Sequence, residues 1–278
     1  MMNRNGRIAL GGAVVAAGAI AWMAARERHS DAPASYPPLD VLKPFAEDVW
    51  IVDSGPMIAS GLSLPIRMTV VRLSGRALLL HSPTPFTPAL AAALSELGTV
   101  THLVAPNIAH WTRIAGWQRA CPDAIVWGAP GLAERAQVKR GDLRVDRDLS
   151  ADAPPEWADT IEQGAITGAA GFSEIWFFHR PSRTLILTDI VQQMEPERLP
   201  PLTALIARLS GGAKGTTPRY LRPVLRLGAG MRDTFAHLVA LAPERVVFAH
   251  GTPFTADATA RLRDALAWSG VAGSDLPD

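Results

Sequence analysis

Cysteine is almost absent from this chain of 278 residues, and neither sign of charge is in excess. The single cysteine, Cys121, excludes an internal disulfide framework and a zinc site built on paired thiolates. Lysine and arginine total 27 against 26 acidic residues, for a net charge of +1, so we expect no nucleic-acid partner. What the chain does have is a hydrophobic fraction of 48%, which suits one medium-sized domain with a sizeable core.

An uncharged apolar run occupies residues 8–25, after Arg4 and Arg7 and before a charged cluster at 26–28. As a helix it would span about 27 Å, close to the thickness of a bilayer's hydrocarbon core. We therefore expect a single-pass N-terminal anchor that holds the protein at a membrane through residues 8–25. The alternative is a signal peptide cleaved near Ala21, after which the protein is exported.

The rest of the chain divides by composition. The stretch DAPASYPP at 31–38 is rich in proline and has no periodicity, so it is expected to form a stiff linker. We predict an N-terminal segment over 1–30, a linker over 31–40, one globular domain over 41–270 and a tail over 271–278.

Within the globular part, short β-branched or apolar runs alternate with stretches of helical spacing. Ser74-Gly75 predicts a hairpin turn between two of the runs. The predicted strands cover 48–53, 67–73, 76–82, 100–106, 124–130, a hairpin over 173–189, and 244–250. The predicted helices cover 87–98, 199–212, 231–241 and 255–270. This order predicts an α/β fold with two sheets and helices outside them.

One phrase occurs twice. Thr-Pro-Phe-Thr follows a strand and a histidine at 84–87 and again at 252–255, and a predicted helix follows each copy. The repeat indicates two similar strand-to-helix halves, or simply a favourable joint in which Thr87 and Thr255 cap the helices.

Four apolar strands end in side chains that can bind a metal or transfer a proton: His81, Asn107 followed by His110, Asp189, and His250. Loops beyond the carboxyl ends of strands converge in open α/β structures, so these residues are candidates for one site. Imidazole and carboxylate ligands suit zinc, iron or manganese, and a metal-bound water can attack an ester or phosphate.

Each candidate also has a simpler interpretation. His250 precedes Gly251, which either allows close approach to a ligand or only makes a turn. Asp189 could cap the segment after it, and His110 could lie half exposed on a helix. His81 is expected to hydrogen-bond a neighbouring loop, and His179 to be exposed at a hairpin turn.

The phrases LKPFAEDVWIVD, RMTVVRL, HSPTPFTPAL, HLVAPNIAH, EIWFFHRPSRTLILTD and ERVVFAHG resemble the DUF4336 proteins over roughly residues 38–268. This family is similar to a diverged branch of the metallo-β-lactamase fold. The resemblance implies an αββα sandwich.

The resemblance also implies where a metal site would lie and what it has lost. The superfamily's main cluster, His-x-His-x-Asp-His, corresponds to 106–111, where His110 remains as the potential ligand. Asp189 and His250 fall at the positions of the bridging acid and the last histidine. The stretch 168–174, where a further histidine is usual, contains none.

Two functions remain open at this stage. The sequence favours a metal-free descendant that binds a small molecule or partner in the cleft, with His81, Asn107 and Trp111 as candidate binding residues. The alternative is a hydrolase of an ester or phosphoester. In it, His110, Asp189 and His250 hold one divalent ion, zinc or iron, and Asp189 and His250 are the catalytic residues.

Overall fold

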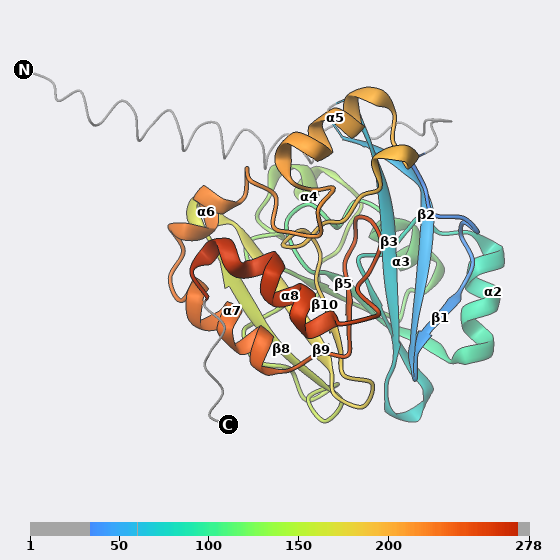
Figure 1. The fold of residues 1–278 in the computed structure, drawn as a ribbon. Coiled ribbons are helices and arrows are strands. Elements are labelled where there is room, and N and C mark those ends of the chain that lie inside the picture. The colour runs from blue at the N-terminus through green and yellow to red at the C-terminus, as the bar shows by residue number, and fades with distance from the viewer. Residues whose placement is uncertain (1–33, 60, 272–278) are drawn as a thin grey trace, which may run out of the picture.

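The computed structural model describes residues 34–59 and 61–271. Two β-sheets lie face to face, and helices cover the outer side of each (Figure 1). The predicted anchor over 8–25 and the cleavage near Ala21 lie outside the described residues. Among the described helices, none has the length and apolarity needed to cross a bilayer.

The first sheet has seven strands in chain order. They are β1 (Lys43–Ala46), β2 (Val49–Ala59), β3 (Leu62–Arg72), β4 (Ala77–His81), β5 (Thr99–Ala105), β6 (Ile125–Gly128) and β7 (Arg147–Asp148). The strands from β1 to β4 pair antiparallel and those from β4 to β7 pair parallel. The short helix η1 (Ser74–Arg76) joins β3 to β4, which confirms the predicted turn.

The second sheet has the order β11-β10-β9-β8. Its strands are β8 (Ile161–Thr167), β9 (Ser173–His179), β10 (Thr184–Ile186) and β11 (Arg245–Val247). β9 and β10 form the predicted hairpin, and β11 joins β10 in parallel. Sheet residues alternate between the two faces, so Phe177 packs between the sheets while Trp176 and Phe178 face outward.

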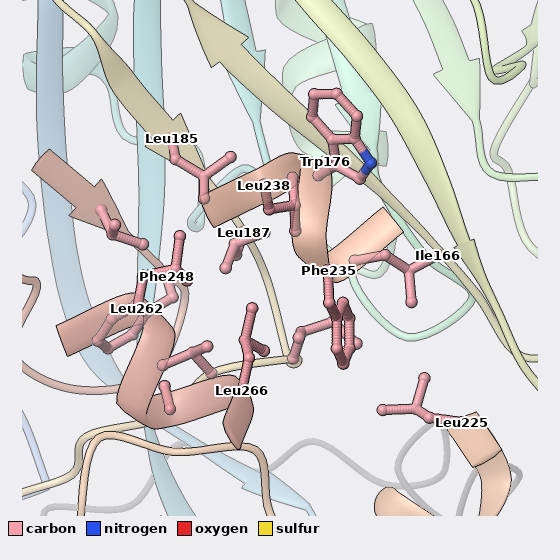
Figure 2. Close-up of a cluster of buried hydrophobic side chains, with 14 of the residues drawn as sticks. Ile166, Trp176, Leu185, Leu187, Leu225, Phe235, Leu238, Phe248, Leu262 and Leu266 are labelled. Atoms are coloured by element: carbon pink, nitrogen blue, oxygen red, sulfur yellow. The ribbon is translucent and has the colours of Figure 1, made fainter. Parts of the chain in front are cut away.

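Helices close both outer faces. On the first sheet lie α2 (Pro88–Leu97), α3 (Ile114–Ala120) and the short α4 (Ala136–Arg140). On the second lie α6 (Arg222–Arg226), α7 (Met231–Ala240) and α8 (Ala258–Leu266), whose apolar side chains meet the sheet in the cluster of Figure 2. The remaining helix, α5 (Pro201–Ser210), lies near the β2–β3 hairpin (Figure 1). Four layers in the order αββα confirm the predicted sandwich.

The two Thr-Pro-Phe-Thr joints do not fold alike. Thr87 caps α2 as predicted, since its hydroxyl accepts the N–H of Leu90 at 3.1 Å. The prediction for Thr255 is wrong, because α8 begins only at Ala258 and Asp257, with φ 51°, stands at its N-cap. The second joint first folds back on β11, where Phe254 pairs with Val246.

Candidate metal centre

Three of the predicted residues converge at one end of the sandwich. His110 lies in the loop after β5, Asp189 follows β10 and His250 follows β11. One potential ligand atom from each lies within 4.8 Å of the other two. The His110 Nε2 atom is 3.4 Å from Asp189 Oδ2, and the His250 Nε2 atom is 3.2 Å from Asp189 Oδ1. The spacing matches three protein ligands around one ion.

The hydrogen bonds of His250 define which proton it carries. Its Nδ1 atom lies 2.7 Å from the carbonyl oxygen of Pro65, which can only accept, so Nδ1 carries a hydrogen. In a neutral ring, Nε2 would then present a lone pair to the Asp189 carboxylate. Two lone pairs at this distance repel each other, so a hydrogen or a metal ion must lie between the two atoms. Either a second proton on His250 or a metal ion meets this requirement.

The loop that presents His110 is shaped by Asn107. The Asn107 Oδ1 atom accepts the backbone N–H groups of Ala109 and His110 at 2.9 and 3.0 Å. Its Nδ2 group therefore faces the other way and donates to Asp189 Oδ2 at 2.7 Å. The His110 Nδ1 atom pairs with the Ser82 hydroxyl at 2.7 Å, which leaves Nε2 toward Asp189. Outer hydrogen bonds of this kind orient imidazole ligands in metal sites.

Asp189 is a buried carboxylate among hydrogen-bond donors. Burial acts to raise its pKa, but His110 and His250 outweigh this effect and hold the pKa well below the usual value. The carboxylate is therefore ionised throughout the neutral range. An anion held this way is a suitable metal ligand, and equally a suitable partner for an imidazolium.

Glu174 is the residue that sequence reasoning missed. Its side chain is fully buried, and its carboxyl oxygens accept the backbone N–H groups of Thr188 and Asp189 at 2.8 and 2.7 Å. Burial, together with the charge of Asp189, raises the pKa of Glu174 to about 8. It occupies the stretch where a histidine was sought, and it holds the backbone of Asp189 instead of facing the ligand atoms. The available signal was an acidic residue inside an otherwise apolar strand.

The loop that carries His250 is held in place by Arg67. The buried Arg67 side chain donates to the carbonyl oxygens of Phe248 and Gly251 and pairs with Asp53 at 2.6 Å. Gly251 has φ 103°, and a Cβ there would lie 2.0 Å from the Gln193 carbonyl oxygen. At this glycine the structure shows a close approach of the protein's own Gln193 backbone, which differs from both roles considered for it, approach to a ligand and a simple turn.

Of the other predicted residues, Asn107 bonds the Asp189 carboxylate, whereas His81, Trp111 and His179 do not belong to the group of three potential ligands. His81 is buried against Phe177, and its Nε2 atom has no partner among the described residues, so that atom does not make the expected loop hydrogen bond. Burial first, and then His110, lowers the pKa of His81 to about 3. Trp111 packs against the apolar cluster between the first sheet and the helices on its outer side. The prediction that His179 is exposed is wrong, because it is buried and bonded to the Ser182 hydroxyl at 2.7 Å.

Access to the centre is narrow. A cavity of about 20 Å³ reaches His110, and it is lined by Met57 and Ile66 of the β2–β3 hairpin. Ser82, Pro83, Ala109, Thr112 and Arg113 complete its wall. This volume is close to that of one water molecule. His250 and Asp189 are themselves 3% and 4% exposed, so the three residues meet in a nearly closed space.

The sequence of the chain matches the model of a known protein family. A model of the family described as "Domain of unknown function (DUF4336)" matches residues 46–215. The chain belongs to this family. No curated protein matches it in sequence.

Among solved structures, metallo-β-lactamases share the fold. The DIM-1 metallo-β-lactamase is 11% identical, with a TM-score of 0.54 over 82% of this chain and 97% of that one. The enzyme from Erythrobacter litoralis with β-mercaptoethanol in its active site is 14% identical, with a TM-score of 0.56 over 82% and 96%. A rubredoxin oxygen:oxidoreductase from Desulfovibrio gigas is 12% identical, with a TM-score of 0.57 over 82% and 61%. These identities establish the fold alone.

Proposed function

We propose that this DUF4336 protein binds one divalent metal ion, zinc or iron, through His110, Asp189 and His250. We further propose that it uses the ion to hydrolyse a small ester or phosphoester. The convergence of the three ligand atoms within 4.8 Å carries the proposal. This convergence supports a metal site over the metal-free interpretation that the sequence favoured.

The donor set fits the proposed group. Two imidazoles, each with Nδ1 already engaged, and one ionised carboxylate form a common catalytic set of three protein ligands. A dinuclear centre is not proposed, because the described residues supply one group of this kind.

Each residue then has a defined task. When bound, the ion would supply a Lewis acid and a water of lowered pKa. His110 and His250 would hold it through Nε2, while Ser82 and the Pro65 carbonyl fix the two rings. Glu174 would keep the Asp189 backbone in place, and the Asn107 amide would orient the Asp189 carboxylate. Met57 and Ile66 would exclude bulk water and limit the size of the substrate.

A second candidate function is the metal-free one, which two observations favour. The Asn107 amide already occupies Asp189 Oδ2, and the cavity beside His110 holds little more than a water. In this version His250 is an imidazolium paired with Asp189. The centre then serves as a structural ion pair beneath a surface that binds a small molecule or partner.

Metal analysis separates the two functions. We would purify the chain, reconstitute it with Zn²⁺ or Fe²⁺ and measure metal per chain by mass spectrometry, beside a His250→Ala/Asp189→Ala variant. His237→Ala is the matched control, since His237 is a half-exposed histidine paired with Glu162 away from the centre.

We expect about one ion in the wild type and in the control, and none in the double variant. Equal metal in all three proteins would contradict the proposed site. Hydrolysis of p-nitrophenyl esters and phosphoesters by the loaded protein tests the second half of the proposal. A loaded protein that cleaves neither class would remove the hydrolase assignment while leaving the metal site.

A further inference from the structure

The helix α5 buries small side chains and exposes large apolar ones, the reverse of the usual arrangement in a globular protein. It buries small side chains, Thr203, Ala204 and Ala207, against the domain. Its large apolar side chains are exposed: Leu202 59%, Leu205 52%, Ile206 37% and Leu209 63%. These four positions follow the spacing i, i+3, i+4, i+7, so they form one stripe. Among the described residues, this stripe is therefore apolar surface that no other element covers.

The helix α2, of the same length, shows the ordinary arrangement. It also begins with proline and has ten residues, but it buries Leu90 and Leu94. Ala92 and Ser95 are among its exposed residues. The stripe on α5 is therefore a property of that helix and not of this fold's helices in general.

Basic residues lie at the edge of the stripe, and two of them pair with carboxylates. The sequence from 198 to 232 contains seven basic residues and no acidic one: Arg198, Arg208, Lys214, Arg219, Arg222, Arg226 and Arg232. Three of them lie on α5 or next to it. Arg208 is on the helix, Arg198 lies just before it, and the Arg219 guanidinium donates to the Leu209 carbonyl at 3.1 Å. The acidic residues that pair with Arg198 and Arg208 are Glu195 and Glu197, both before the helix. We call the stripe with these three arginines the α5 face.

The N-terminal end of the described chain meets the same helix. Ala34 is fully buried in a cluster with Met194, Leu199, Ala204 and Ala207, directly under α5. The Tyr36 hydroxyl accepts the N–H of Glu195 at 3.1 Å, which holds the N-terminal end of the described chain beside the segment that precedes α5. Residue 25, the end of the apolar run, can lie at most about 30 Å of extended chain from Ala34. A membrane reached by residues 8–25 is thus within reach of the α5 face.

We propose that the α5 face lies on the surface of an anionic lipid bilayer. The leucines and Ile206 enter the boundary between headgroups and acyl chains, and the three arginines contact lipid phosphates. Exposed leucines on a helix with basic residues beside them are typical of a helix that lies at a membrane interface. The sequence predicts a membrane contact through residues 8–25, and the α5 face would be a second contact, made by the folded domain.

The test must distinguish α5 from the N-terminal segment, so it reads single positions in the full chain. With Cys121→Ser as background, an environment-sensitive fluorophore is placed at Leu205→Cys, or at Leu209→Cys as a second site. The matched control is Ala92→Cys, an exposed position on α2. Each protein is mixed with phosphatidylcholine vesicles with or without phosphatidylglycerol, and with vesicles that carry a lipid-bound quencher.

We expect the label on α5 to shift to the blue and to be quenched on anionic vesicles, while the label at 92 keeps its spectrum in buffer. Arg208→Glu/Arg219→Glu should reduce the quenching. An α5 label that keeps its buffer spectrum on vesicle-bound protein would overturn the proposal, as would equal effects with neutral lipid. A blue shift without vesicles would also overturn it. Dependence on protein concentration would then identify a second copy of the chain as the occupant, and independence would identify residues 8–25.

Discussion

The two strand ends that precede Thr-Pro-Phe-Thr look alike in sequence and differ in what they do. β4 ends at His81 and β11 is followed by His250, each with an apolar strand before it. His81 is buried, and its Nε2 atom has no hydrogen-bond partner in the part of the chain that the structure describes. His250 is held by the Pro65 carbonyl and faces Asp189. The histidine alone therefore does not make a candidate ligand. The partners that make His250 one come from β3 and from the end of β10, far away in the chain.

The largest expected difference appears when each histidine is replaced by leucine. His250→Leu leaves the buried Asp189 charge without one of its two imidazole partners, which should lower the free energy of unfolding by about 3–5 kcal/mol at pH 7. His81→Leu removes an unpartnered polar atom from an apolar site, so we expect a change within about 1.5 kcal/mol. Urea unfolding of both variants measures the difference. Equal losses would show that the two strand ends are equivalent.

The residue after each histidine gives the next comparison. Gly251→Ala would place a Cβ against the Gln193 carbonyl at a positive φ, which should cost about 3 kcal/mol or more. Ser82 already carries a Cβ at φ 53°, so Ser82→Ala should lose only the bond to His110, about 1 kcal/mol. Thermal unfolding checks both values, and an alanine tolerated at 251 would show that the loop around His250 can move.

His81 should also contribute to the pH dependence of the free energy of unfolding. Because burial lowers its pKa to about 3, the native state binds fewer protons than the unfolded state between pH 6.5 and about 3. This contribution is complete above pH 6.5 and is lost as the pH falls through that window, by up to about 1.4 kcal/mol per pH unit. His81→Leu should flatten the loss when unfolding is followed from pH 7 to 4. An unchanged slope would mean that His81 does not titrate in this way.

The smallest effect concerns the two threonines. Thr87 caps α2, so Thr87→Ala should lower the free energy of unfolding by about 1 kcal/mol. Thr255 caps no helix, and Thr255→Ala should change it by less than about 0.5 kcal/mol. Denaturant midpoints of the two variants decide the matter. A larger loss at Thr255 would reverse the comparison.

Much of the fold could be predicted because it depends on local patterns. Runs of β-branched and apolar residues indicated the strands, and Thr87 indicated the start of α2. The ends of β10 and β11 identified Asp189 and His250 as candidates. What could not be predicted depends on tertiary contacts.

Three residues show why. Glu174 acts on backbone groups that the chain order does not place beside it. His179 is buried because β8 and β10 flank β9 on both sides. Thr255 fails as a cap because Phe254 pairs back on β11.

The central claim is that a metal ion binds between the Nε2 atom of His250 and the Asp189 carboxylate. Long-range ¹H–¹⁵N spectra of the histidine side chains at pH 7.5, without and with one equivalent of Zn²⁺, test it directly. We predict that zinc shifts the Nε2 nitrogen of His250 to a metal-bound value, while Nδ1 keeps its hydrogen on the Pro65 carbonyl oxygen. A His250 Nε2 nitrogen that zinc leaves unchanged would contradict the account.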